Sequence, residues 1–207
     1  MRLASRYVQS GPVQLNSLPM PFTWLRTPAV WNLEDGLTID APPTSDWFID
    51  PGGAVSVTNA PALLGRPPDD DFTLLARVHL DATATFDAGV LFVYADDTTW
   101  AKLCLERSPD GRMMIVSVVT RGTSDDCNSH TVDGNIAWLR ASRFSSAFAF
   151  HASRDGKRWE LVRHFGLPTS DVQIGFEVQS PTGDGCRAIF ADVAYANRQL
   201  TELRDGT

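Results

Sequence analysis

Ionisable side chains interrupt an apolar strand pattern in residues 100–106, WAKLCLE. Lys102, Cys104 and Glu106 alternate with leucines, so one face of the predicted strand is apolar and the other carries a charge at each end. Lys102 and Glu106 would lie about 13 Å apart, too far for an ion pair but near enough for one ligand to contact both. Such a pair in a sheltered groove can exchange protons with a substrate or hydrogen-bond its hydroxyl groups. The alternative is an outer face on which both side chains are hydrated.

A second strand near the end of the chain has the same character. In residues 172–179, Glu177 and Gln179 alternate with apolar side chains and so share the opposite face. Crowded carboxyl groups raise one another's pKa, whereas a nearby lysine lowers the pKa of a carboxyl group. A cleft that held Lys102, Glu106 and Glu177 would therefore be suited to general acid–base chemistry.

The segment after the first of these strands supplies further oxygen atoms. A turn at residues 108–111 leads into a β-branched strand, 113–120, which ends at Thr120, and a polar loop with Asp125 and Asp126 follows. Consecutive carboxylates could ligate a hard cation such as Ca²⁺, or they could cap their own loop as Asx-turns. The spacing is not that of an EF-hand, and we predict no metal or cofactor.

Asp46 and Trp47 form a third candidate, because they precede a Pro-Gly turn and so are expected in an exposed loop. A carboxylate next to an indole offers a hydroxyl acceptor together with a stacking surface for a sugar ring. Trp100 and Trp138 are further candidate platforms. For any tryptophan of a β-sandwich, a place in the core is the alternative.

The elements that must position these residues are short strands. An outer strand and turn are predicted within residues 22–32, and further strands at residues 36–41, 54–58, 72–80, 89–95, 100–106, 113–120, 146–153, 159–164, 172–179 and 188–194. Strands about ten residues apart with Asp-Gly and Pro-Gly turns indicate an all-β sandwich or jelly roll. We expect an N-terminal arm over residues 1–20, a single domain over 21–207, and one short helix at 197–204.

Composition excludes several classes of function. A net charge of −7 without a basic stripe argues against nucleic acid or an anionic membrane as partner. No segment approaches the roughly 18 apolar residues needed to span a bilayer. Nucleotide-binding loops, zinc motifs and a nucleophile elbow are missing from the sequence. Three cysteines and no apolar leader favour a reduced cytoplasmic protein.

Several blocks of sequence together resemble one family. They are TSDWF (44–48), NAP (59–61), FDAGV (86–90), WAKLCLE (100–106), SVVTRG (117–122), SDDCNS (124–129), RDGKRW (154–159) and QSPTG (179–183). In content and order these blocks look like the DUF1349 family, and the resemblance spans about residues 22–194. It implies a concanavalin A-like jelly roll of two curved antiparallel sheets, one of them concave. It also implies that the strands of Lys102 and Glu177 share the concave sheet, so that their polar faces converge.

We therefore predict a protein that binds a polar small molecule, such as a carbohydrate or glycoside, in the concave groove. Lys102, Glu106 and Glu177 are the predicted acid–base groups, and the predicted ligand-binding residues are Asp46, Trp47, Thr120, Asp126 and Gln179. The second hypothesis is an enzyme acting on a glycoside or specialised metabolite: a lyase, hydrolase, isomerase or cyclase. The Glu-X-Asp-X-X-Glu run of the superfamily's glucanases is missing, which counts against their chemistry. The third is a regulatory protein-interaction module, which a shallow, apolar concave face would favour.

Overall fold

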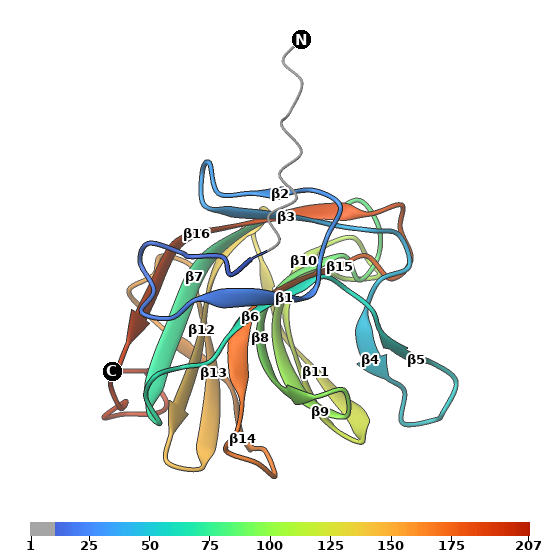
Figure 1. The fold of residues 1–207 in the computed structure, drawn as a ribbon. Coiled ribbons are helices and arrows are strands. Elements are labelled where there is room, and N and C mark those ends of the chain that lie inside the picture. Colours follow the sequence, from blue (N-terminus) through green and yellow to red (C-terminus); the bar gives the residue numbers. More distant parts are fainter. Residues whose placement is uncertain (1–10) are drawn as a thin grey trace.

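Every regular element of the protein is a strand in the part described by the computed structural model, residues 11–207. Two seven-stranded antiparallel sheets lie face to face and a two-stranded hairpin stands beside them (Figure 1). The front sheet consists, in spatial order, of β1 (Phe22–Arg26), β6 (Ala62–Gly65), β15 (Gln173–Gln179), β8 (Ala88–Asp96), β9 (Thr99–Arg107), β10 (Met113–Arg121) and β11 (Thr123–Val132). The back sheet consists of β14 (Glu160–Gly166), β13 (Ala147–Ser153), β12 (Ile136–Phe144), β7 (Phe72–Asp81), β16 (Cys186–Ala196), β3 (Leu37–Ala41) and β2 (Trp31–Asn32).

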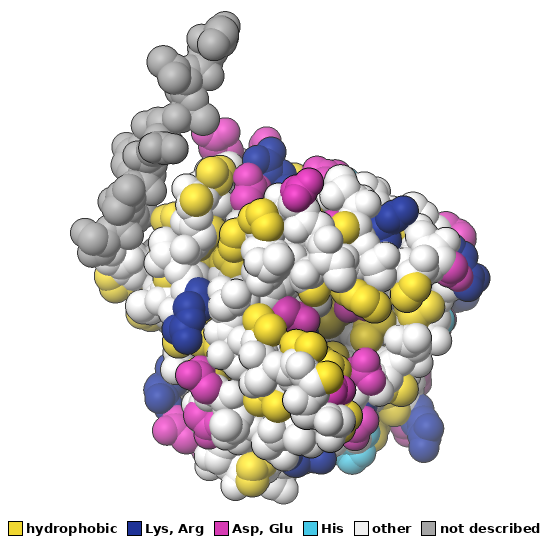
Figure 2. All heavy atoms as spheres, turned by 90° about the vertical axis from the view of Figure 1, so that its right-hand side faces the viewer, with side chains coloured by type: hydrophobic (Ala, Val, Ile, Leu, Met, Phe, Trp, Pro, Cys, Tyr) yellow, Lys and Arg dark blue, Asp and Glu magenta, His cyan; other side chains and the backbone are white. Residues whose placement is uncertain are grey.

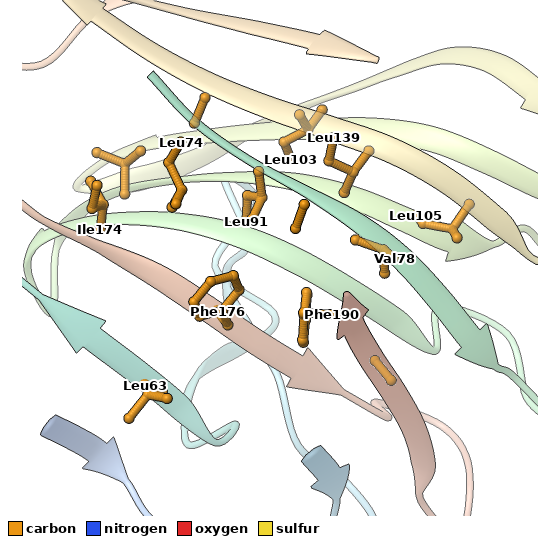
Figure 3. Close-up of a cluster of buried hydrophobic side chains, with 14 of the residues drawn as sticks. Leu63, Leu74, Val78, Leu91, Leu103, Leu105, Leu139, Ile174, Phe176 and Phe190 are labelled. Atoms are coloured by element: carbon orange, nitrogen blue, oxygen red, sulfur yellow. The ribbon is translucent and has the colours of Figure 1, made fainter. Parts of the chain in front are cut away.

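The main core lies between the sheets and follows from the alternation of the sequence. Leu103 and Leu105 of β9 point toward the back sheet, where they meet residues such as Val78 of β7 (Figure 3). Phe176 of β15 and Phe190 of β16 pack across the interface with ring centroids 5.0 Å apart. Because successive strand residues face opposite ways, burying these side chains turns the polar residues of β9 and β15 to the outer face of the front sheet.

The hairpin of β4 (Trp47–Ile49) and β5 (Ser56–Thr58) covers part of that outer face. It lies at the right of Figure 1, beyond β9–β11. Its base is fixed by Trp47, which is fully buried, and by a 2.9 Å hydrogen bond that the Ile49 amide donates to Ser124 Oγ of β11. The front sheet therefore has a second apolar cluster on its outer side, between the sheet and this hairpin.

The predicted polar loop after residue 122 is a strand, and this prediction was wrong. β11 runs antiparallel to β10 at the edge of the front sheet. Most of its side chains are exposed, so it shows no apolar face from which a strand would be predicted. The predicted helix at 197–204 was also wrong. Asn197 and Gln199 donate side-chain hydrogen bonds to Asp69 and Asp71, which hold this segment against the loop before β7.

The expected N-terminal arm is described from residue 11 onward; residues 1–10 lie outside the described part. In the described part of the arm, Val13, Leu15, Leu18 and Met20 are buried against the main core. Val13 also exchanges backbone hydrogen bonds with Phe22 at the start of β1.

Candidate functional site

A pocket of about 700 Å³ opens between the outer face of the front sheet and the β4–β5 hairpin. We call it the front pocket. Its wall on the hairpin side consists of Phe48, Asp50, Ala54, Val55 and Val57, and its floor includes Lys102, Glu106, Met114, Val116 and Val118. Figure 2 shows the face on this side of the molecule, with a hollow bordered by hydrophobic and acidic side chains. The outer face is thus not the shallow surface that would have favoured a protein-docking role.

Lys102 is buried at the inner end of this pocket, with 2% of its surface exposed. Its Nζ donates hydrogen bonds to Gln179 Oε1 at 2.7 Å and to Asp46 Oδ1 at 3.1 Å. Burial alone would lower the pKa of Lys102, but the charges of Asp46 and Glu177 outweigh burial and hold the pKa above its ordinary value. Lys102 is therefore a permanent buried cation, neutralised by Asp46.

Asp46 is held in place by the backbone around it. The Trp47 amide donates to Asp46 Oδ1 at 2.7 Å, and the Asp46 amide donates to Asn59 Oδ1 at 3.0 Å. The carbonyl of Asp46 accepts from the amides of Asn59 and Ala60. The blocks TSDWF and NAP thus form one unit that fixes the counter-ion of Lys102.

Glu106 lines the same pocket and is half-buried. Burial raises its pKa to about 8, against the opposing effect of Lys102, and Asp46 and Asp126 raise it further. Below that pH the carboxyl group keeps its proton, so that near neutrality it can both donate and accept hydrogen bonds.

Glu177 does not line the front pocket, because its side chain is fully buried on the outer face of β15. Neither of its carboxyl oxygens has a hydrogen-bond partner among the described residues. Burial raises the pKa of Glu177 to about 8, while Lys102 acts in the opposite direction. The structure thus places Glu177 apart from the pocket lining, so that any effect of Glu177 on a ligand would pass through its neighbours.

Two of the predicted ligand-binding residues do not reach the pocket. Thr120 is fully buried and shares a 2.9 Å hydrogen bond with Ser124 Oγ at the base of the hairpin. Trp47, predicted to be an exposed stacking platform, is also fully buried, and this prediction was wrong. It packs edge-on against Trp100, which is likewise buried, and donates from Nε1 to the Ala60 carbonyl at 3.0 Å.

Because Trp47 is a core residue, the change Trp47→Phe should lower the free energy of unfolding by about 2 kcal/mol. The smaller ring leaves a cavity, and the buried Ala60 carbonyl loses its donor. Urea denaturation will measure the change. Trp31→Phe, at a half-buried position in β2, is the control and should cost less than half as much. Equal costs for the two variants would contradict this role of Trp47.

Alternation along β11 separates the two consecutive aspartates. Asp126 lines the front pocket, whereas Asp125 faces away and accepts a 2.8 Å hydrogen bond from Arg163 Nη2 of β14. The two carboxylates therefore do not converge on one cation. Within residues 11–207 no three His, Cys, Asp or Glu side chains gather closely enough to hold a metal ion.

The apolar part of the site was not predicted from the sequence. Phe48, Val55 and Val57 come from the hairpin, and Phe86 comes from the loop between β7 and β8. Phe86 belongs to the FDAGV block, which marks the position in the sequence without indicating a role. Val55 and Phe86 are 47% and 40% exposed, and exposure of such side chains beside a pocket is the signal that only the structure provides.

An all-β sandwich of two antiparallel sheets, with a pocket on the outer face of one curved sheet, defines a protein of the concanavalin A-like class. Within this class the chain belongs to the DUF1349 family, described as proteins of unknown function, whose model matches residues 24–198. A curated relative from Saccharomyces cerevisiae, "Regulation of enolase protein 1", is 29% identical over an alignment of 174 residues, which covers 82% of this chain and 86% of the relative.

Solved structures agree with this fold. The crystal structure of a functionally unknown protein from Saccharomyces cerevisiae has a TM-score of 0.79 and 26% identity, covering 86% of this chain and 97% of that one. A xylan β-1,4-xylosidase from Bacillus halodurans has a TM-score of 0.68 at 13% identity, covering 89% of this chain but 37% of that enzyme. The second likeness concerns the fold alone. No helix in residues 11–207 is long and apolar enough to cross a membrane.

Proposed function

We propose that the protein binds a carbohydrate or glycoside in the front pocket. The observation that carries this proposal is a pocket of about 700 Å³ at whose inner end Lys102, Asp46, Gln179 and Glu106 present polar atoms. That volume lies in the range of small-molecule sites. Mixed donors and acceptors held by a fixed network suit a polyol, because each hydroxyl group both donates and accepts hydrogen bonds.

Asp126 and Asp125 provide a sharp test, because they are adjacent in sequence and face opposite ways. Calorimetric titration with a panel of monosaccharides and their glycosides should find a ligand of millimolar affinity or better. Asp126→Ala should lower that affinity about 10-fold, because a hydrogen bond to a charged group is lost. Asp125→Ala, which breaks only the exposed contact with Arg163, should leave the affinity within about 2-fold. A panel without any binder, or an equal loss for both variants, would refute the proposal.

A second function, general acid catalysis, is favoured by one observation. The carboxyl group of Glu106 lines the pocket and has a pKa of about 8, so it can deliver a proton near neutrality. Such an enzyme would be a hydrolase, lyase, isomerase or cyclase that acts on a glycoside or specialised metabolite. It would use Glu106 as its acid, and Lys102 would supply a fixed positive charge near Glu106. Turnover that survives unchanged in Glu106→Gln would exclude this role.

A further inference from the structure

The front pocket has two chemically different parts. Polar atoms of Lys102, Gln179 and Glu106 gather over β15, β8 and β9, where Gln179 and Glu106 both pair in register with Ala88. The next strand, β10, presents only apolar side chains to the pocket. They are Met114, Val116 and Val118, and Met114 lies directly beside Glu106 in the sheet.

The hairpin supplies a largely apolar wall, in which Asp50 is the one charged side chain among the described lining residues. Phe48 and Val57 are register partners on β4 and β5, and Val55 follows from the turn between these strands. All three line the pocket together with the apolar strip of β10. A group enclosed between the hairpin and β10 would bury apolar surface on two sides, which is the main source of affinity for apolar ligands.

Phe86 adds another apolar side chain to the pocket lining, in the loop next to Gln179. Its backbone is left-handed, with φ of 69°, an unfavourable conformation for a bulky side chain. The Phe86 carbonyl accepts a 3.2 Å hydrogen bond from Gln179 Nε2, and its amide donates to the Arg107 carbonyl at 2.7 Å. These two bonds hold the strained residue in the pocket lining, where Phe86 remains 40% exposed. Strain of this kind is often retained at ligand-binding positions.

The charges of the residues that line the pocket restrict the charge that a ligand can carry. Among the lining residues that the structure describes (11–207), Lys102 is the only basic one, and Asp46 already neutralises it. Asp50, Asp126 and Glu106 add three more carboxyl groups. A uronate or sugar phosphate would bring a negative charge to this site without an available cation, and such a charge is costly to desolvate.

We propose that the front pocket selects uncharged glycosides with an apolar aglycone. The sugar lies at the polar part and reaches Asp126 of β11 at the edge of the apolar strip, and the aglycone lies between the hairpin and β10, with Phe86 and Val55 at its border. This inference rests on the proposed function, since it assigns the sugar to the same polar part. Val55, Phe86 and the hairpin then act as specificity determinants, which separate such glycosides from free sugars and acidic sugars.

The test compares methyl and hexyl glycosides of several neutral hexoses and pentoses with hexyl glucuronide and 1-hexanol, by calorimetric titration. Each methylene group removed from water can raise affinity up to about 4-fold. A hexyl glycoside should therefore bind at least 10-fold more tightly than its methyl counterpart. It should also bind at least 10-fold more tightly than either the glucuronide or hexanol.

Two exposed valines give a matched pair of variants. Val55→Asp should remove most of the preference for the hexyl group, whereas Val30→Asp, at a position 45% exposed and away from the pocket, should leave the preference intact. Phe86→Ala, at another exposed position, should lower hexyl glycoside affinity at least 5-fold while changing methyl glycoside affinity less than 2-fold.

The outcomes separate this inference from the proposed function. Equal affinities for methyl and hexyl glycosides would overturn the aglycone site and leave sugar binding intact. Tighter binding of the glucuronide would overturn selection for uncharged ligands. Hexanol binding as tightly as the hexyl glycosides, or no binding by any glycoside, would overturn sugar recognition itself and this inference with it.

Discussion

Replacing Asp46 with alanine should destabilise the folded protein by about 3 kcal/mol or more. Lys102 is 2% exposed and stays charged, so the loss of Asp46 leaves a cation that is buried without its main counter-ion. Removing one partner of a buried ion pair typically costs about 3 to 5 kcal/mol, more than the pair itself contributes. Urea denaturation at pH 7 will measure the change, with Asp125→Ala as an exposed aspartate control.

A second substitution, which removes the buried cation itself, should restore stability. Lys102→Met keeps the volume of the side chain and removes the cation, and the partly exposed Asp46 that remains is hydrated more easily than a buried ammonium group. We therefore expect Lys102→Met to cost less than Asp46→Ala. The double variant Asp46→Ala/Lys102→Met should be more stable than Asp46→Ala alone. Additive costs in this double-mutant cycle would show that Asp46 does not neutralise Lys102.

The orientation of the site residues could be predicted from the sequence, because it depends on a period of two. Lys102 and Glu106 alternate with leucines, and Glu177 and Gln179 alternate with apolar residues, so the outward direction of each follows from local pattern. The adjacency of their strands does not follow from local pattern. That two segments about 70 residues apart share one sheet was implied by the family resemblance, and the 2.7 Å contact of Lys102 with Gln179 bears it out.

How deeply each of these side chains is buried could not be predicted, because burial depends on which segments cover each face of the sheet. Trp47 lies next to a Pro-Gly turn and was expected in an exposed loop, yet the hairpin that begins with Trp47 folds back over the front sheet and buries it. Glu177 faces the predicted side but lies fully buried and outside the pocket. Both outcomes arise from contacts between distant segments, which a single sequence does not display.

The apolar half of the pocket escaped prediction for a related reason. Val55 and Val57 lie in a short, partly exposed hairpin, where valines indicate a strand without indicating a ligand surface. The left-handed backbone of Phe86 has no signature in the sequence, since such positions usually carry glycine or asparagine. Neighbouring strands supply the polar part, whereas a hairpin and a strained loop supply the apolar part. Substitutions in the β4–β5 hairpin and in the Phe86 loop would therefore change ligand preference. They would leave the hydrogen bonds of Lys102 with Asp46 and Gln179 in place.

The stability of the protein should fall as pH rises from about 5 to about 8, and Glu177 should be the main cause. Its pKa is about 8 in the folded protein against an ordinary value of 4.5. Between these values the unfolded chain has released the proton and the folded protein still holds it. The folded state then binds more protons, so the free energy of unfolding decreases with increasing pH. The decrease begins near the lower pKa and is complete above the higher one.

Glu177→Gln should remove this dependence, because the amide stays neutral at every pH. We expect the variant to be about 3 kcal/mol more stable than the wild type at pH 8.5, since each unit of pKa shift corresponds to about 1.4 kcal/mol and relaxation of the site reduces the total. At pH 4.5 the wild type should be at least as stable as the variant.

Glu106→Gln should show a smaller effect of the same sign, because Glu106 is half-buried. Glu160→Gln, at an exposed position, should follow the wild type throughout. Parallel pH profiles for Glu177→Gln and the wild type would mean that Glu177 is ionised in the folded protein, as a second counter-ion of Lys102.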